Sequence, residues 1–227
     1  MEFQPADILL MTRTDNVFMK CLCETICLLD NFHGLPSVCH AAILDEDLNT
    51  VGMEAEGLLV QSMDSLLAKT GHCYLYRYKV ETCPWYNDLA PVIDRIEYYK
   101  DKDPPYAYMD YALLPFIVLS RKIALDTLSP LQQEELREVI DECCLKIEEN
   151  IRLYSDSMIC SELVYRCYDE SRLHPVILGT EQANNTNLFT DKQQMILKQL
   201  FGEVVPNWVT PGDLISSPSL SFVNQLK

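Results

Sequence analysis

Apolar and polar positions follow two different periods along the chain, and the change of period marks the predicted elements. Short apolar or alternating runs, which favour β-strands, occupy residues 6–11, 37–44, 51–60 and 73–80. A short acidic turn, 45–50, separates the second run from the third. Two apolar runs around such a turn predict a β-hairpin.

Apolar residues at helical spacing predict several helices. The clearest begins at Ser129, with Pro130 at the first helical position and Gln132 placed for a capping box. A second important helix starts near Asp156 or Ser157 and continues through MICSELVYRCY. Further helices are predicted at 16–29, 62–69 and 191–201, and a last strand at 211–218. Together these elements predict a mixed α+β domain.

The length of 227 residues fits one domain, because it is enough for a well-covered core and no linker divides the chain. We therefore expect residues 1–227 to form a single domain. Residues 82–105 are rich in proline and are a candidate insertion that shapes the cleft.

Charge and cysteine content narrow the expected partners and compartment. The net charge is −16, which repels phosphate backbones and anionic membrane surfaces, so we expect no nucleic-acid partner. The N-terminal segment lacks the features of a secretory signal, and no run of 18 apolar residues predicts a membrane span. Ten cysteines without an export signal indicate reduced thiols, and the expected location is cytoplasmic.

Cys160 is the first candidate for chemistry. A thiol must ionise to act as a nucleophile, and the N–H groups and dipole at a helix N-terminus stabilise the thiolate. With Asp156 or Ser157 as the cap, Cys160 falls in the first turn of the predicted helix. The alternative is that Cys160 is one of several small apolar core residues.

His40 lies within a predicted strand among apolar neighbours, where a buried imidazole needs a polar partner. If the hairpin turn is centred near Asp47, residues whose numbers sum to about 94 face each other, so His40 faces Glu54. Side-chain alternation then predicts Glu56 on the same sheet face. A carboxylate beside an imidazole fixes its tautomer and stabilises its protonated form. The alternative is a satisfied core histidine and a surface glutamate.

Five segments in order carry a resemblance to a known family: PADILLMTR, VCHAAIL, GMEAEGLLV, YAYMDYALLPF and MICSELVYRCY. The set resembles the permuted branch of NlpC-type papain-like proteins, the YiiX/YebB-like group. This resemblance implies a circularly permuted papain-like fold, an antiparallel sheet packed against helices, in which the histidine precedes the cysteine. PGDLI at 211–215 is a further family-like segment.

Carried over by position, the resemblance implies that Cys160 is the nucleophile, His40 the base and Glu54 the orienting residue. It also implies that Tyr108 or Tyr111 lies near the substrate cleft. Two departures are visible. Ala6 stands where the family's opening strand usually has glycine, and the EAEG stretch leaves Glu56 as a rival of Glu54 and a second polar residue for substrate binding.

Three functions remain open at this point. The first is a cysteine hydrolase that cleaves an amide or peptide bond of a peptide or amino-acid amide through an acyl-enzyme. The second is an acyltransferase that moves an acyl chain from a lipid or thioester donor to an amine. The third is a non-catalytic binding module. A panel of peptide and lipid donors separates the first two, and the absence of any acyl-enzyme indicates the third.

We expect neither a metal nor a cofactor. Cys21, Cys23 and Cys27 match no common zinc spacing and lie on a predicted helix, where packing explains them. The acidic residues after Ser129 form the solvated face of a helix. The chain has neither a phosphate-binding loop nor a GxGxxG motif.

Overall fold

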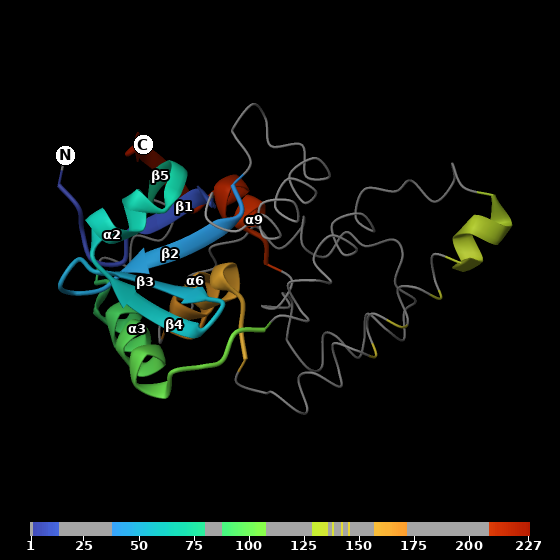
Figure 1. Cartoon of the computed structure of the whole chain (residues 1–227), viewed down its shortest axis with the longest axis horizontal. Coiled ribbons are helices and arrows are strands. Elements are labelled where there is room, and N and C mark those ends of the chain that lie inside the picture. The colour runs from blue at the N-terminus through green and yellow to red at the C-terminus, as the bar shows by residue number, and fades with distance from the viewer. Residues whose placement is uncertain are drawn as a thin grey trace.

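A computed structural model describes residues 2–13, 38–79, 88–107, 129–135, 157–171 and 209–227, and the single positions 138, 142 and 145. Six strands form one sheet in the order β4-β3-β2-β1-β5-β6, and each neighbouring pair is antiparallel (Figure 1). The strands are β1 (Ile8–Arg13), β2 (His40–Leu44), β3 (Thr50–Glu54), β4 (Gly57–Gln61), β5 (Thr70–Tyr78) and β6 (Leu220–Gln225).

Helices cover both faces of this sheet (Figure 1). They are α2 (Met63–Ala68), α3 (Ala90–Lys102), α6 (Cys160–Asp169) and α9 (Pro211–Ser216). Side chains of α3, α6 and α9 share one apolar core with one face of the sheet, whereas Leu66 of α2 packs on the other face. The molecule is therefore an α+β protein in which an antiparallel sheet packs against helices.

The alternation of β1 shows how one strand contributes to both cores. Ile8 and Leu10 belong to the larger core beneath α3 and α6, while Leu9 and Met11 belong to the core beneath α2. All four side chains are fully buried. A central strand buried on both faces has a continuous apolar sequence, which is why ILLM is predictable as a strand.

Several predicted elements are confirmed. The predicted strands 6–11 and 73–80 overlap β1 and β5, 37–44 contains β2, and 62–69 contains α2, whose cap is Ser62. Residues 130–135 are helical, and Ser129 and Gln132 exchange the two hydrogen bonds of a capping box. The predicted helices at 16–29 and 191–201 lie outside the described residues.

The prediction of one strand over 51–60 is wrong. A turn at Ala55 and Glu56 divides the segment into β3 and β4, which pair with each other. Gly57 has a φ of +121°, a conformation that only glycine adopts easily, and it allows the chain to reverse at this point. The sequence EAEG therefore contains a turn signal that the apolar pattern around it conceals.

The predicted strand at 211–218 is also wrong, because these residues form α9. Thr210 accepts a hydrogen bond from the backbone of Asp213, and the Asp213 carboxylate accepts one from the backbone of Thr210. Pro211 occupies the first turn, where its missing N–H costs nothing. A capping box and proline at the N-terminus favour a helix more strongly than the apolar pair Leu214–Ile215 favours a strand.

Residues 90–102 are an integral part of the fold rather than an excursion from it. They form α3, whose buried residues Val92, Ile96 and Tyr99 belong to the larger core, and α3 packs against α6. The interpretation of 82–105 as an insertion stays a prediction, and residues 82–87 lie outside the described residues. No helix within the described ranges is long and apolar enough to cross a membrane.

Candidate active site

His40 and Glu54 lie at the same end of the sheet because His40 begins β2 and Glu54 ends the antiparallel β3. The observed register pairs Ala42 with Gly52 and Leu44 with Thr50. This is the register that the hairpin predicts. Continued by two residues, it places His40 beside Glu54.

The two side chains form a close contact at this end of the sheet. Nε2 of His40 lies 3.3 Å from Oε1 of Glu54. His40 is 3% exposed, and the Glu54 side chain 13%. The N–H direction at Nε2 is not aligned for a hydrogen bond, so the contact is best described as an ion pair. Nε2 is thus on the carboxylate side, which leaves Nδ1 as the nitrogen available for a thiol.

Cys160 is the first residue of α6 and is 1% exposed. The helix cap is Ile159, so the predicted caps are wrong: Ser157 lies outside the helix, and Asp156 lies outside the described residues. The reason is that Met158 is held extended by a parallel bridge to Tyr106. Two backbone hydrogen bonds maintain it, from Met158 N–H to the Pro105 carbonyl and from the N–H of Ala107 to the Met158 carbonyl.

A second anchor fixes the start of α6. The hydroxyl of Ser161, fully buried, donates a 2.6 Å hydrogen bond to the carbonyl of Val209. The first intrahelical bond runs from the N–H of Leu163 to the Ile159 carbonyl. The N–H of Cys160 therefore has no acceptor within the helix and is available to a bound group.

Cys160 lies close enough to His40 for charge on its sulfur to raise the pKa of the imidazole. Burial alone lowers the pKa of His40, but negative charge on Cys160 and on Glu54 outweighs burial and raises this pKa to about 10. At neutral pH the imidazole is therefore protonated. The arrangement favours an imidazolium beside the Glu54 carboxylate.

Gly52 makes room for this imidazole. A Cβ atom at position 52 would lie 3.6 Å from Nε2 of His40 and 3.3 Å from the Cβ of Ala42. The second distance is shorter than most real Cβ contacts. A methyl group here would need Ala42 to shift by a few tenths of an ångström, so glycine is favoured by a close approach rather than by backbone conformation.

Other predicted site residues are placed differently or are not described. Glu56 is exposed in the turn between β3 and β4, so its predicted place on the sheet face with Glu54 is wrong. Tyr108 and Tyr111 lie outside the described residues. The same is true of Cys21, Cys23 and Cys27.

The described cysteines other than Cys160 are Cys39, Cys73 and Cys167; all are buried, and none is in a disulfide with another described cysteine. Burial raises the pKa of Cys73 to about 12 and also raises the pKa of Cys167. Both remain thiols at neutral pH and are poor nucleophiles. Among the described residues, no group of three or more His, Cys, Asp or Glu side chains could hold a metal ion.

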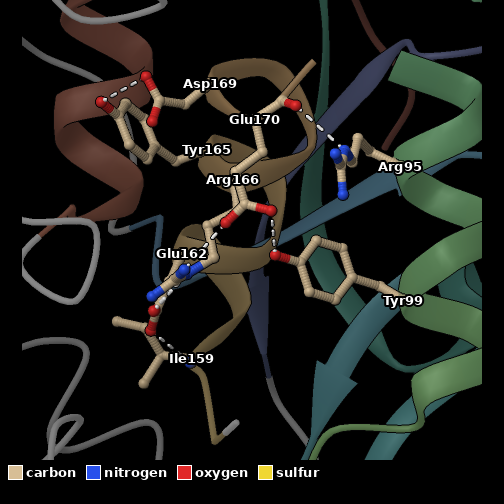
Figure 2. A network of polar contacts seen from close by, with 8 residues as sticks. All are labelled: Arg95, Tyr99, Ile159, Glu162, Tyr165, Arg166, Asp169 and Glu170. Carbon is tan, nitrogen blue, oxygen red and sulfur yellow. Dashed lines mark hydrogen bonds and ion pairs between the residues drawn. The ribbon is translucent and has the colours of Figure 1, made fainter. Parts of the chain in front are cut away.

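A polar network beside Cys160 was not predicted. Figure 2 shows Glu162, Arg166 and Glu170 in a row along α6, with Tyr99 reaching them from α3. Glu162 is fully buried, whereas its sequence context marks it only as part of a family-like motif. The spacing of four residues between the three charges is the available sequence signal, because such residues are neighbours on a helix.

The site thus combines the first residue of a helix with the ends of two paired strands, and it brings a thiol, an imidazole and a carboxylate into one line of contacts. Such a line can transfer a proton between sulfur and nitrogen while the carboxylate holds the ring. Compared with known proteins, the chain matches no family model and no curated protein.

Proposed function

We propose that this protein is a papain-like cysteine hydrolase of permuted chain order that cleaves an amide or peptide bond. The observation that carries the proposal is the pair of partners around His40: the Glu54 carboxylate 3.3 Å from Nε2, and Cys160, whose charge raises the pKa of the imidazole. The same contacts raise the pKa of His40 to about 10, as an imidazolium paired with a thiolate requires.

In the first step, the thiolate of Cys160 attacks the carbonyl carbon of the substrate and forms a C–S bond. The carbonyl oxygen becomes an oxyanion, to which the free N–H of Cys160 donates a hydrogen bond at the positive end of α6. The imidazolium of His40 gives its proton to the amide nitrogen. The C–N bond then breaks, the amine leaves, and a thioester remains on the sulfur.

In the second step, neutral His40 accepts a proton from water, whose oxygen attacks the thioester carbon. The C–S bond breaks and the carboxylic acid leaves. The proton on His40 and the negative charge on sulfur restore the starting pair. Glu54 takes no proton in this cycle; it orients the ring and stabilises its charged form.

The substrate class follows from the sequence resemblance and not from the contacts themselves. The permuted NlpC-type proteins that the five segments resemble suggest a peptide or amino-acid amide. Acyl transfer would use the same thioester but deliver the acyl group to an amine or alcohol in place of water. Donor preference therefore distinguishes the two reactions.

The test is intact-mass detection of an acyl group on the protein after rapid acid quenching. The donor panel contains peptide amides, amino-acid amides, an acyl thioester and phospholipid vesicles. We expect a mass increase equal to the acyl group with at least one amide donor, and release of the free acid on longer incubation. His40→Asn removes the group that protonates the leaving amine, so this variant should acylate about 100-fold more slowly or worse.

Cys73→Ala is the matched control, because it removes a buried thiol of β5 whose pKa is raised to about 12. This variant should acylate like the parent, whereas Cys160→Ala should not acylate at all. An adduct that persists in Cys160→Ala, or no adduct with any donor, would contradict the proposal. Acylation only by phospholipid or thioester, with transfer to an amine, would support the acyltransferase instead.

A further inference from the structure

Glu162 is a fully buried carboxylate in the first turn of α6, two positions after Cys160. One carboxylate oxygen accepts a hydrogen bond from the N–H of Ile159 at 3.3 Å. The other lies 2.7 Å from Nε of Arg166 (Figure 2). Glu162 thus contacts the residue directly before the nucleophile, and it leaves the N–H of Cys160 itself unused.

Arg166 is in turn held in place from two helices. Its Nη1 lies 2.9 Å from Oε1 of Glu170, whose Oε2 accepts a 2.7 Å hydrogen bond from the Tyr99 hydroxyl. The carbonyl of Glu170 accepts another from Nε of Arg95 (Figure 2). Because Arg95 and Tyr99 belong to α3, the network ties the orientation of α6 to a neighbouring helix.

The opposite charges of Glu162 and Arg166 also affect how easily Cys160 ionises. The Glu162 carboxylate accepts from the N–H of Ile159, the residue before Cys160, so its negative charge lies near the start of α6 and disfavours a thiolate there. The Arg166 guanidinium, 2.7 Å from the carboxylate, offsets that charge. Burial lowers the pKa of Arg166, but the charge of Glu162 outweighs this and raises it, so the guanidinium is charged throughout the working range. Glu162 is fully buried and the Arg166 side chain is only 24% exposed, so water cannot readily take the place of the guanidinium at the carboxylate.

We infer that Glu162 and Arg166 are positioning residues for Cys160: the carboxylate fixes the backbone before the nucleophile, and the guanidinium prevents that carboxylate from suppressing the thiolate. The inference rests on the proposed function, since it assigns a role toward the same sulfur. Neither residue touches the substrate. Each acts through the start of α6.

Other titratable groups lie on the elements packed against α6. They include His40 on β2, Glu54 on β3, Arg95 and Tyr99 on α3, and Asp213, which caps α9. All of these remain unchanged in the variants proposed next. Differences between the variants therefore report on the Glu162–Arg166 pair.

The test measures the rate of Cys160 alkylation by iodoacetamide as a function of pH in the full-length chain, with peptide mapping to identify the labelled thiol. Arg166→Gln exposes the sulfur to an unbalanced carboxylate, so the midpoint pH should rise by about one unit and the rate at pH 6 should fall about tenfold. Glu162→Gln removes the repelling charge, so the midpoint should fall. Arg166→Lys keeps the charge and should stay near the parent.

The double variant Glu162→Gln/Arg166→Met removes both charges and should return the midpoint to near that of the parent. Opposite shifts of the alkylation midpoint in the two single variants, cancelled in the double variant, support the inference. A purely structural role would move the midpoints of both single variants in the same direction. Identical midpoints or shifts of the same sign would overturn it. If Arg166→Gln does not fold, as judged by circular dichroism, the other two variants decide. A lower midpoint in Glu162→Gln that returns to the parent value in the double variant supports the inference, and any other pattern overturns it.

This experiment separates the inference from the proposed function. Alkylation requires no substrate, so the midpoints can be compared whether or not the donor panel yields an acyl-enzyme. If Cys160 in the parent reacts no faster at neutral pH than the other buried thiols, the proposed nucleophile fails. If Cys160 reacts faster but its midpoint is the same in all variants, only the positioning role fails.

Discussion

Replacing Cys160 by alanine should lower the pKa of the neighbouring His40 imidazole, since this replacement removes the largest influence that raises it. In the parent, this pKa is raised from 6.5 to about 10, although burial opposes the rise. The net rise of roughly 3.5 pH units corresponds to about 5 kcal/mol in favour of the charged imidazole. An opposite charge at hydrogen-bonding distance typically contributes 1–3 pH units, so Cys160→Ala should lower the pKa by roughly that amount.

The assay is a pH titration of the histidine ring resonances by ¹H–¹⁵N correlation spectroscopy. The chain contains four histidines, and the resonance lost in His40→Asn identifies the ring of interest. In the parent, this ring should stay protonated from pH 5.5 to 8.5. In Cys160→Ala it should begin to lose its proton within that range. Glu54→Gln should have a smaller effect in the same direction, because the carboxylate is the weaker of the two influences.

Two results would refute the reasoning. One is a parent His40 resonance that titrates at or below pH 6.5, because burial would then dominate over both negative partners. The other is a raised pKa that does not change in Cys160→Ala, because the charge on sulfur would then have no part in it. Either result removes the electrostatic basis for a thiolate–imidazolium pair.

Three further predictions concern stability, measured as the free energy of unfolding in urea. Ala6 has a φ of +66°, a strained conformation for alanine. In Ala6→Gly the strain relieved should offset the lost buried methyl group, so the free energy of unfolding should change by no more than about 0.5 kcal/mol. Ala41→Gly in β2 relieves no such strain and should cost about 1.5 kcal/mol. Arg77→Met should cost about 3 kcal/mol, because it leaves the buried Asp7 carboxylate without its two 2.7 Å contacts; Asp7→Asn in the same chain should recover part of this. Thr210→Ala should cost about 1 kcal/mol through loss of the α9 cap. A cost for Ala6→Gly equal to that of Ala41→Gly, or no measurable loss in either of the other two variants, would contradict the respective explanation.

The proximity of His40 and Glu54 was predictable from local sequence, whereas the approach of Cys160 to His40 was not. A five-residue turn sets the β2–β3 register, so the proximity of His40 and Glu54 follows from chain geometry. Cys160 comes from a helix far along the chain, and its approach to His40 depends on how α6 packs on β2 and β3. Only the family resemblance connected these residues before the coordinates did, and the catalytic roles remain a proposal.

Two of the errors in the sequence predictions share one physical cause, which is that short polar signals were given less weight than apolar runs. The turn at Gly57 and the capping box at Thr210 each outweigh the apolar residues around them. The start of α6 is set by a different influence, the tertiary bridge between Met158 and Tyr106, which no local pattern contains. Ala6 has a positive φ, a conformation that glycine adopts more easily than alanine, and no apolar or polar pattern in the sequence predicts it.

The strand order also has a consequence for folding kinetics. The β2–β3 and β3–β4 hairpins close loops of a few residues and can form early. In contrast, β6 reaches β5 only after the chain closes on itself over a long separation, as between Ser221 and Arg77, which are 144 residues apart. Such closure is entropically costly and slow, so β5 should spend part of the folding reaction with one edge unprotected, when association between chains is most probable.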